Sequence, residues 1–446
     1  MDFISNQEPQ IQEMLKVLGI SDIDALFADI PAQIKLDRPT VDDGLSEYEG
    51  SRLMESLAAK NTFRSFENYL GAGAYEHYIP ALTAAICSKS EFLTSYTPYQ
   101  PEASQGMLQI IFEFQSAICA LTGMDVANAS VYDGASACAE AALIALRCHP
   151  ERKKILIAAS VHPNYQAVVA QYLAGHGIEV IKVPFQESGE LDTAVLKSQL
   201  NAETAAVLIQ SPNFLGNIEN MKEVVALAKP FETLVIQCAN PLAYGVFASA
   251  GELGVDIAVG DCQPFGLALN YGGPYAGYIA CKQALLRQLP GRIVGETVDT
   301  QGRRGFVLTL QAREQHIRRE KATSNICTNQ ALAALASLIA ILWYGKEGVP
   351  KLALTNFQRA AYLKQQLEAI PGVKTTSGAI FNEFLVKFPH PAAQVQRHFR
   401  THQIELGFAV EALYPSLPDW ILVAVTETKS KMQLDRYISI AKELRL

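Results

Sequence analysis

Short apolar runs without polar alternation recur at regular intervals through the middle of the chain. They lie at residues 154–160, 178–185, 205–212 and 233–240. Segments with helical spacing precede and separate them, at residues 104–122, 137–147, 162–175 and 220–231. Apolar strands that alternate with helices are typical of a parallel sheet covered by helices on both faces. The pattern therefore predicts a large α/β domain, rich in parallel strands, which we place at residues 61–345.

The two ends of the chain follow other patterns. Residues 1–60 are polar and helix-prone, and the helical spacing at residues 11–20 gives way to breaks at Pro31, at Pro39 and at Asp42-Asp43-Gly44. We expect this segment to be an N-terminal helical arm. Beyond it, alternating helices and strands are expected at residues 357–370, 379–389, 394–399, 420–427 and 431–444. Their order predicts a small C-terminal α+β domain with a partly antiparallel sheet, at residues 346–446.

The composition narrows the class of protein. Hydrophobic residues make up 49% of the 446 positions and charged residues 18%, which is enough for a buried core and an apolar face for a partner. The formal net charge of -8 argues against nucleic acid as a ligand, because phosphates would be repelled. The longest apolar stretch, residues 331–343, is too short to span a bilayer, and we expect it to be a buried core helix.

The cysteines and the N-terminus indicate a compartment. Eight cysteines are scattered singly, without a Cys-x-x-Cys pair. Structural zinc sites and redox dithiols commonly use such pairs, so no metal site is predicted, and free thiols in a reducing compartment are favoured. The first ten residues lack the basic and apolar regions of a secretory signal. These features predict a cytoplasmic protein without a membrane segment.

A turn of small residues precedes the helical segment 137–147. Gly134 lets backbone N–H groups at a helix start approach an anion closely, and Ser136 adds a hydroxyl donor. The alternative is an ordinary N-cap, in which Asp133 or Ser136 accepts from the first-turn amides. Taken alone, the alternative is favoured. His162 follows the first predicted strand, where a single histidine more often has a structural role.

The order of arm, large α/β domain and small α+β domain resembles that of fold type I pyridoxal-phosphate enzymes, although layout alone does not give function. In these enzymes an aromatic residue near the position of His162 often stacks on the pyridine ring. The chemistry needs an acid facing the pyridine nitrogen and a lysine for the Schiff base. Gln237 or Asn240 stands where the acid is expected, and Gln263 stands where the lysine is expected. We therefore expect no catalytic residue in this chain.

Four longer segments carry a specific family resemblance. The most distinctive is REQHIRREKATSNICT, and the four lie at residues 96–106, 270–277, 289–295 and 310–328. Together they closely resemble the P-protein of the glycine cleavage system, over nearly the whole chain. P-proteins occur as one long chain of two similar halves or as two separate subunits. The length and the Gln263 substitution resemble the first half, which is subunit 1 of the two-subunit form.

The resemblance implies an activity and partners. The family is a glycine dehydrogenase (aminomethyl-transferring, decarboxylating) whose second subunit carries the pyridoxal-phosphate lysine. Glycine loses its carboxylate as carbon dioxide, and the aminomethyl group passes to the lipoyl arm of the H-protein. The implied assembly is an α2β2 heterotetramer, with no cofactor bound covalently to this chain.

Fold type I sites lie at subunit interfaces, so this chain is expected to supply residues to its partner's site. Thr323, Ser324 and Asn325 offer hydroxyl and amide groups to the phosphate of the partner's cofactor. The alternative is that residues 313–321 form a solvated helix face with local ion pairs. The run Thr-Ser-Asn-Ile-Cys-Thr is a poor continuation of such a helix, which favours the functional interpretation.

A second segment, residues 96–105, offers the phenols of Tyr96 and Tyr99 to the same site. Its alternative is a structural turn that caps the following helix at Ser104. Gly134, Ser136 and His162 would then line a degenerate site of the chain's own.

Two other functions stay open on the sequence. A self-sufficient pyridoxal-phosphate decarboxylase would need a lysine-linked cofactor, and the purified chain would then be yellow. A purely structural or regulatory subunit would stabilise its partner without approaching the cofactor. Contact between this chain and the cofactor in the assembled complex would distinguish the last alternative from a shared site.

Overall fold

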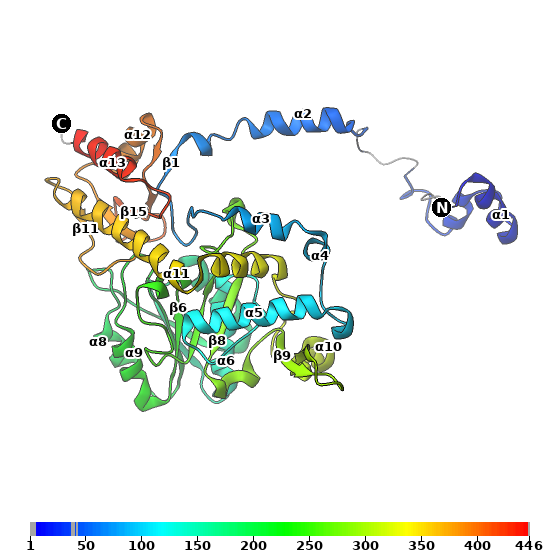
Figure 1. Ribbon diagram of the computed structural model, residues 1–446, viewed down its shortest axis with the longest axis horizontal. Helices are drawn as coiled ribbons and strands as arrows, with labels where there is room; N and C mark the ends of the chain where they lie inside the picture. The colour runs from blue at the N-terminus through cyan, green and yellow to red at the C-terminus, as the bar shows by residue number, and fades with distance from the viewer. Residues whose placement is uncertain (1–5, 37–40, 42, 445–446) are drawn as a thin grey trace. The chain divides into compact units, whose positions relative to one another are not determined.

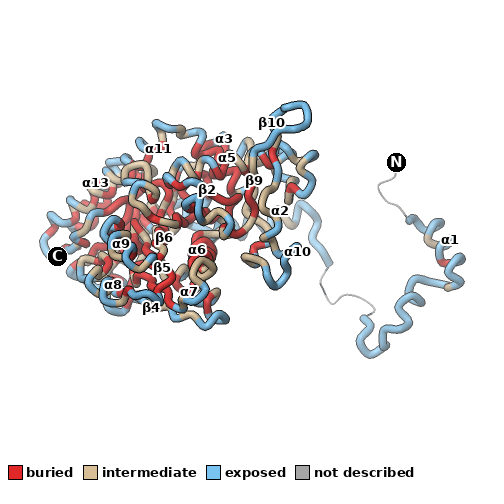
Figure 2. The backbone as a smooth tube through the Cα atoms, turned by 90° about the horizontal axis from the view of Figure 1, so that it is seen from below, coloured by how far each residue is buried: buried red, intermediate tan, exposed pale blue. Residues whose placement is uncertain are grey.

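The computed structural model describes residues 6–36, 41 and 43–444, and it divides into two compact units, Met1–Thr62 and Phe63–Leu446. The predicted helix breaks at Pro39 and Asp42 lie outside the described residues. The first unit contains α1 (Glu8–Leu18) and α2 (Glu47–Ala58), and most of its residues are exposed (Figure 2). The helix expected from the spacing at residues 11–20 is confirmed. It ends at Gly19, whose φ of 71° suits a glycine C-cap.

A seven-stranded sheet forms the centre of the second unit (Figure 1). Its order is β2 (Val126–Ala127), β8 (Gly277–Cys281), β7 (Ile257–Asp261), β6 (Leu234–Cys238), β5 (Thr204–Gln210), β3 (Lys154–Ala158) and β4 (Glu179–Val183). The five strands from β7 to β4 are parallel, whereas β8 and β2 are antiparallel to their neighbours. All four predicted apolar strands are confirmed. The first six residues of β5 are buried, and since successive side chains point to opposite faces, both faces of the sheet are covered.

Helices pack on this sheet and connect its strands. They include α5 (Gln105–Thr122), α6 (Gly134–Cys148), α7 (Pro163–Leu173), α8 (Thr193–Gln199) and α9 (Met221–Ala228). α6 packs across β5 to β8, and α5 packs on β2, on β8 and on a hairpin of β9 (Ile293–Val298) and β10 (Arg304–Thr309). α6 begins three residues before the predicted helix, because Asp133 caps it.

The two helices predicted at residues 331–343 and 357–370 belong to one long element, α11 (Ala331–Glu368). The backbone breaks at Gly345, where φ is 62°. α11 is long and apolar enough to cross a membrane by length and composition alone, but 50% of its most apolar window is buried in the protein, as in the core helix of a soluble protein. Residues 334–341 are buried, as expected of a core helix, whereas Leu332, Leu342 and Trp343 are exposed.

α11 continues into the C-terminal elements, coloured orange and red in Figure 1. A four-stranded antiparallel sheet has the order β11 (Lys374–Thr375), β12 (Glu383–Lys387), β15 (Trp420–Ala424) and β14 (Phe408–Ala409). It packs with α12 (Ala392–Thr401) and α13 (Lys431–Glu443) around a core of its own that includes Phe384, Phe399 and Tyr437. α11 crosses the predicted boundary between residues 345 and 346, and the division into three domains stays a prediction.

The chain that precedes α5 is tied to these C-terminal elements. β1 (Glu67–Asn68) pairs in parallel with β13 (Ile404–Glu405). Residues 69–80 then lead to α3 (Ala81–Cys87) and α4 (Ser90–Leu93). This pairing brings residues 71–78 next to the carboxyl end of the central sheet, where ligands bind in open α/β sheets.

Candidate functional site

The N-terminus of α6 is the place where a phosphate is expected in the chain's own site. Both the backbone N–H and the hydroxyl of Ser136 donate to Asp133 Oδ1, at 2.7 and 2.8 Å. The backbone N–H of Gly134 donates to Asp261 Oδ2 at 3.1 Å. The donors that would bind a phosphate therefore already donate to the carboxylates of Asp133 and Asp261. The N-cap by Asp133, the favoured alternative in the sequence, is confirmed.

Burial governs the charge of Asp261 at this helix end. Removal from solvent raises its pKa to about 7, even though the N–H groups of Gln263 and Gly134 favour the charged form. A phosphate placed here would meet two carboxyl groups, Asp133 and Asp261, instead of free amides. The helix end is thus satisfied from within the chain.

His162 lies at the start of α7 and faces the same place. Its Nδ1 accepts from the N–H of Asn164 at 3.1 Å, so its Nε2–H donates to the carbonyl of Ala72 at 2.9 Å. Burial lowers the pKa of His162, which keeps the ring neutral. The ring stacks on Tyr165, with centroids 4.6 Å apart. Its stacking partner is therefore a tyrosine of this chain.

Tyr165 also fills space against the start of α6. A Cβ added to Gly134 would lie 2.6 Å from the Tyr165 hydroxyl. The glycine, which the sequence suggested for close approach of an anion, accommodates this phenol. Burial raises the pKa of Tyr165 well above its ordinary value, so the hydroxyl stays protonated.

Gln263 follows β7 and stands where the cofactor lysine is expected. Its side-chain oxygen accepts from the N–H of Tyr75 at 2.9 Å, and its amide nitrogen donates to the carbonyl of Tyr75 at 2.8 Å. The same nitrogen donates to the carbonyl of Leu267 at 3.1 Å. Both ends of the buried amide are thus paired with backbone. A lysine has no acceptor atom and would leave the N–H of Tyr75 without its partner.

Tyr75 belongs to a segment, residues 71–78, that closes this site. Glu383 of β12 holds it, because Oε1 accepts from the N–H of Ala72 at 2.7 Å and Oε2 accepts from the Tyr75 hydroxyl at 2.8 Å. Burial raises the pKa of Glu383 to about 7, although these two bonds act in the opposite direction. The small C-terminal elements thereby contact the closing segment directly.

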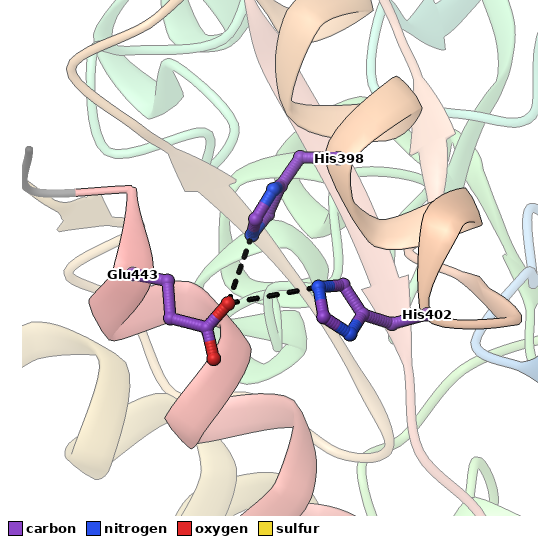
Figure 3. Close-up of side chains that lie close together, drawn as sticks. All are labelled: His398, His402 and Glu443. Atoms are coloured by element: carbon purple, nitrogen blue, oxygen red, sulfur yellow. Dashed lines mark ion pairs between the residues drawn. The ribbon is translucent and has the colours of Figure 1, made fainter.

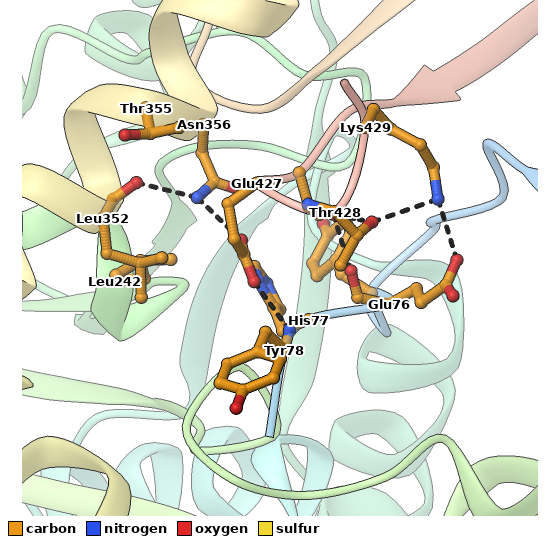
Figure 4. Close-up of polar contacts among 12 residues, drawn as sticks. Glu76, His77, Tyr78, Leu242, Leu352, Thr355, Asn356, Glu427, Thr428 and Lys429 are labelled. Atoms are coloured by element: carbon orange, nitrogen blue, oxygen red, sulfur yellow. Dashed lines mark hydrogen bonds and ion pairs between the residues drawn. The ribbon is translucent and has the colours of Figure 1, made fainter. Parts of the chain in front are cut away.

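Figure 4 shows how the far end of the closing segment is anchored. His77 Nδ1 lies 2.9 Å from Glu427 Oε2, and the N–H of Tyr78 donates to Glu427 Oε1 at 2.7 Å. Asn356 of α11 also donates to this carboxylate, at 3.0 Å. Burial alone would raise the pKa of Glu427, but the bond and charge of His77 and the other donors lower it to about 2. Glu427 is therefore ionised and fixes the end of the segment.

The remaining space does not fit pyridoxal phosphate. The pocket between the closing segment and the sheet has a volume of about 30 Å³, which suits a single water. It is lined by Gly73, Tyr75, His162, Tyr165, Gln210, Cys238, Ala239, Asn240, Asp261 and Pro264. Of the two side chains expected at the acid's place, Asn240 lines this pocket, and Gln237 lines a separate cavity of about 150 Å³.

Tyr96 and Tyr99 lie on the surface, 71% and 68% exposed. Ser104 stands at the N-cap of α5, where the alternative interpretation placed it, but its hydroxyl makes no cap bond. Instead Gln105 Nε2 donates to the carbonyl of Pro101 at 2.7 Å. The turn thus orders the start of α5 and leaves both phenols facing outward.

Thr323, Ser324 and Asn325 line a cavity of about 730 Å³ beside the C-terminal half of α6. The Ser324 hydroxyl donates to Glu140 Oε1 at 2.6 Å, and the carbonyl of Thr323 accepts from Arg147 at 2.8 Å. Asn325 is exposed. Burial raises the pKa of Glu140, whereas Ser324 and Arg147 act to lower it. The segment is thus anchored to α6 by its first two residues and presents the third to solvent.

The basic run at residues 313–321 does not form one solvated helix. α10 (Gln315–Arg318) is four residues long, and a 3-10 turn (Arg319–Lys321) follows it. His316 and Glu314 form a local ion pair, at 3.6 Å. The interpretation as a continuous helix face is therefore wrong, although most of the run is exposed.

Arg292 joins the two predicted segments. It is 4% exposed, and its guanidinium lies 5.9 Å from the centre of the Tyr99 ring. It also donates to the carbonyl of Cys327 at 2.8 Å, and to Thr328 and Asn329, both at 3.3 Å. The tyrosine loop and the end of the 323–329 stretch therefore meet at one buried arginine. We call this region, formed by residues 96–99, 292 and 323–329, the shared-site surface.

A sequence profile of the glycine cleavage system P-protein family matches residues 1–441. The chain belongs to the glycine cleavage system P-protein family. It is 65% identical, over the full length of both chains, to the probable glycine dehydrogenase (decarboxylating) subunit 1 of Protochlamydia amoebophila. The protein of the same name from Desulfitobacterium hafniense is 46% identical, again over the full length of both. The resemblance inferred from the four motifs is confirmed.

Solved structures agree with the family assignment. The crystal structure of a glycine decarboxylase P-protein in inhibitor-bound form matches with a TM-score of 0.91 and 39% identity, covering all of both chains. A sphingosine-1-phosphate lyase of Burkholderia pseudomallei matches with a TM-score of 0.68 over 92% of this chain. At 15% identity, the lyase shows the fold alone. The fold is that of the fold type I pyridoxal-phosphate enzymes, as predicted.

Sequence reasoning in this P-protein missed Arg292 and Asn329. Asn329 donates to the carbonyl of Ala129 at 2.9 Å and lies beside the Ser130 hydroxyl, so it anchors the shared-site surface to the chain before α6. Arg292 lies inside the 289–295 motif, and that placement was an available signal. Its role as a joint depends on contacts between segments almost 200 positions apart, which no local pattern contains.

Proposed function

We propose that this chain is subunit 1 of a two-subunit glycine dehydrogenase (aminomethyl-transferring, decarboxylating), the P-protein of the glycine cleavage system. The observation that carries the proposal is Gln263, whose amide is bonded to Tyr75 and Leu267 where a working site needs a lysine. The names of the full-length relatives support the activity. Gly134, Ser136 and His162 then belong to a degenerate site that serves as structural core.

The partner is proposed to be glycine dehydrogenase subunit 2, in an α2β2 heterotetramer that acts on glycine and on lipoylated H-protein. The words "subunit 1" in the names of the relatives support a second chain. Pyridoxal phosphate, bound by a lysine of the partner, supplies the electron sink for loss of carbon dioxide from glycine. All eight cysteines of this chain are free, which supports a cytoplasmic location.

This chain's own contribution is to complete the partner's site from the shared-site surface. The exposed amide of Asn325 and the hydroxyl of Thr323 are suited to a phosphate or carboxylate, and Tyr96 adds an outward phenol. The ring of Tyr99 supports Arg292. Ser324 is already bonded to Glu140, so its role is to hold the segment in place. Such positioning groups lower the entropic cost of bringing substrate and cofactor together.

The first experiment separates this proposal from a self-sufficient enzyme. We expect the purified chain to stay colourless with added pyridoxal phosphate and to release no carbon dioxide from glycine. Mixing it with subunit 2 should give glycine-dependent decarboxylation. A cofactor linked to a lysine of this chain, detected by borohydride reduction and peptide mapping, would overturn the proposal.

The second experiment tests the shared site. Asn325→Ala should lower decarboxylation by the reconstituted pair about tenfold, the loss of one charge-assisted hydrogen bond. Gln394→Ala, at an exposed amide on α12, is the matched control and should leave the rate unchanged. If Asn325→Ala gives full activity in an intact complex, and Tyr96→Ala does the same, the chain is a structural subunit.

A further inference from the structure

Two histidines and a glutamate lie close together in the C-terminal elements, away from both regions described above. His398 is in the last turn of α12, His402 directly follows that helix, and Glu443 is the last residue of α13. Figure 3 shows both imidazole rings turned toward the carboxylate. Side chains four residues apart lie on the same face of a helix, so the spacing of the histidines brings both to α13.

The three ligand atoms converge on one point. Glu443 Oε2 lies 3.6 Å from the Nε2 atom of His398 and 3.6 Å from that of His402. All three atoms lie within 4.8 Å of one another. Zinc bonds of about 2.0–2.1 Å in a tetrahedral site separate neighbouring ligand atoms by roughly 3.3 Å. Small side-chain movements would therefore bring all three atoms to bonding distance of a single ion.

The histidine nitrogens are free to bind a metal. His398 Nε2 is buried and has no hydrogen-bond partner among the described residues. At 3.6 Å from the carboxylate, the rings form ion pairs only when protonated and make no hydrogen bond to it. A buried nitrogen without a partner is costly, and a metal ion would satisfy it.

The surroundings hold the cluster in place. Phe399, which follows His398 in the sequence, is buried in the core of the C-terminal elements. Its burial fixes the end of α12. The carbonyl of His402 accepts from Arg436 Nη2 at 2.6 Å, and Arg436 also pairs with Glu67. The guanidinium charge is therefore neutralised, so it opposes a bound cation less.

We propose that His398, His402 and Glu443 form a binding site for Zn²⁺ or a similar transition-metal ion, with water in the remaining position. Two imidazole nitrogens and a carboxylate oxygen suit Zn²⁺, Co²⁺ and Ni²⁺ better than Mg²⁺ or Ca²⁺. The ion links the end of α12 to the end of α13. Its role is structural, because the ion would join two helices that pack on the same core of the C-terminal elements.

No motif in the sequence predicts this site. His398 and His402 have helical spacing, but their third ligand is 41 positions further on, at Glu443. The proposed reaction does not require such an ion. The proposal stands independently of glycine decarboxylation.

The test uses the full-length chain freed of metal by a chelator. Titration with Zn²⁺ should show one equivalent bound and a rise in Tm of a few degrees, since an ion that binds the folded state stabilises it. Co²⁺ should give a weak visible spectrum without the thiolate charge-transfer band of cysteine ligands. His398→Ala, His402→Ala and Glu443→Gln should each weaken binding at least tenfold.

Two controls keep the outcome specific. His176→Ala removes an exposed histidine elsewhere, and Cys327→Ser removes the exposed thiol; both should bind metal as the parent chain does. His402 and Glu443 lie at the surface, so their substitution leaves the core intact. Unchanged affinity in the three cluster variants, or no binding of Zn²⁺ by the parent chain at about 100 μM, would overturn the proposal.

Discussion

The chain's own cofactor place and the shared-site surface are built in opposite ways. In the first, Gln263, Tyr165 and the closing segment satisfy one another, and a pocket of about 30 Å³ is left. On the shared-site surface, Tyr96 and Tyr99 stand outward, about 70% exposed, and the Asn325 amide faces solvent. The first region resembles a completed core, whereas the second offers polar groups that a neighbour would complete.

One helix connects the two regions. α6 begins at Gly134 in the closed site, and its later turns carry Glu140 and Arg147, which hold Ser324 and Thr323. The buried hydrogen bonds at its start fix α6, which in turn anchors the shared-site surface through Ser324 and Thr323. Where a working site needs a lysine, this chain has a glutamine whose amide is fully bonded within the chain.

The largest effect is expected in the closed site. Gln263→Lys should not restore a cofactor site, because the introduced ammonium would be buried, the N–H of Tyr75 would lose its acceptor, and the phosphate place is taken by carboxylates. We expect a loss of about 3–5 kcal/mol in the free energy of unfolding and no visible absorption with pyridoxal phosphate. Urea unfolding and absorption spectra measure both.

Gln394→Lys, an exposed glutamine on α12, is the matched control for Gln263→Lys and should change stability by less than about 0.5 kcal/mol. A yellow, stable Gln263→Lys chain would show that the closed site is still a cofactor site, and the contrast between the two regions would fail.

The next effect is expected at the joint of the shared-site surface. Arg292→Met removes the bonds to Cys327, Thr328 and Asn329 and the contact with Tyr99. Misplacement of a site segment by about 1 Å can cost roughly 100-fold in rate, and we expect a loss of that size in decarboxylation by the reconstituted pair. Arg287→Met, at an exposed arginine nearby in sequence, should keep the rate. Full activity of Arg292→Met would show that the arginine does not position the site.

A third effect is a pH dependence in the closed site. The pKa of Glu383 is about 7 in the folded chain, against an ordinary value of 4.5. Between these values the folded state holds a proton that the unfolded state has released, so stability falls as pH rises from about 4.5 to 7. For this shift the loss is at most about 3 kcal/mol. Glu383→Gln cannot ionise, so its unfolding free energy should decline less than that of the parent chain, and the part due to Asp261, whose pKa is also raised to about 7, should remain.

Glu427 provides the internal comparison for that measurement. Its pKa is lowered to about 2, so its contribution is present above pH 4.5 and is lost as pH falls toward 2. Glu427→Gln should therefore flatten the acid side of the stability profile and leave the decline between pH 4.5 and 7. If Glu383→Gln declines as steeply as the parent chain, Glu383 makes no contribution and Asp261 accounts for the whole decline.

Local patterns were sufficient for most of the fold. The four apolar strands and the helices between them follow from burial on both faces, which leaves a clear periodic signal. The sequence missed the joining of two helices into α11, because a glycine break at Gly345 looks like a helix end. The sequence also offered Ser104 as the cap of α5, and Ser104 stands at the N-cap, but its hydroxyl makes no cap bond.

The site was harder to predict, because its decisive contacts are between distant segments. Gln263 was recognised as a substitution for lysine, but its bonds to Tyr75 join positions 188 residues apart. The closing segment has no motif of its own, and neither Glu383 nor Glu427 was singled out. The outward position of Tyr96 and Tyr99 agrees with what the loop composition suggested. The role of Arg292 could be recognised only from contacts in the folded chain.

The smallest effect is expected at Tyr99, where two substitutions distinguish the contribution of the ring from that of the hydroxyl. The guanidinium of Arg292 lies 5.9 Å from the ring centre, and a cation–π contact at an exposed site contributes about 0.5–1 kcal/mol. Tyr99→Leu should therefore lower decarboxylation by the reconstituted pair about two- to fivefold, while Tyr99→Phe keeps the ring and should match the parent rate. If Tyr99→Phe loses as much as Tyr99→Leu, the hydroxyl contacts the partner's site directly. Tyr99 would then be a residue of the partner's site and not only a support of Arg292. The contrast between the shared-site surface and the chain's own cofactor place would become larger.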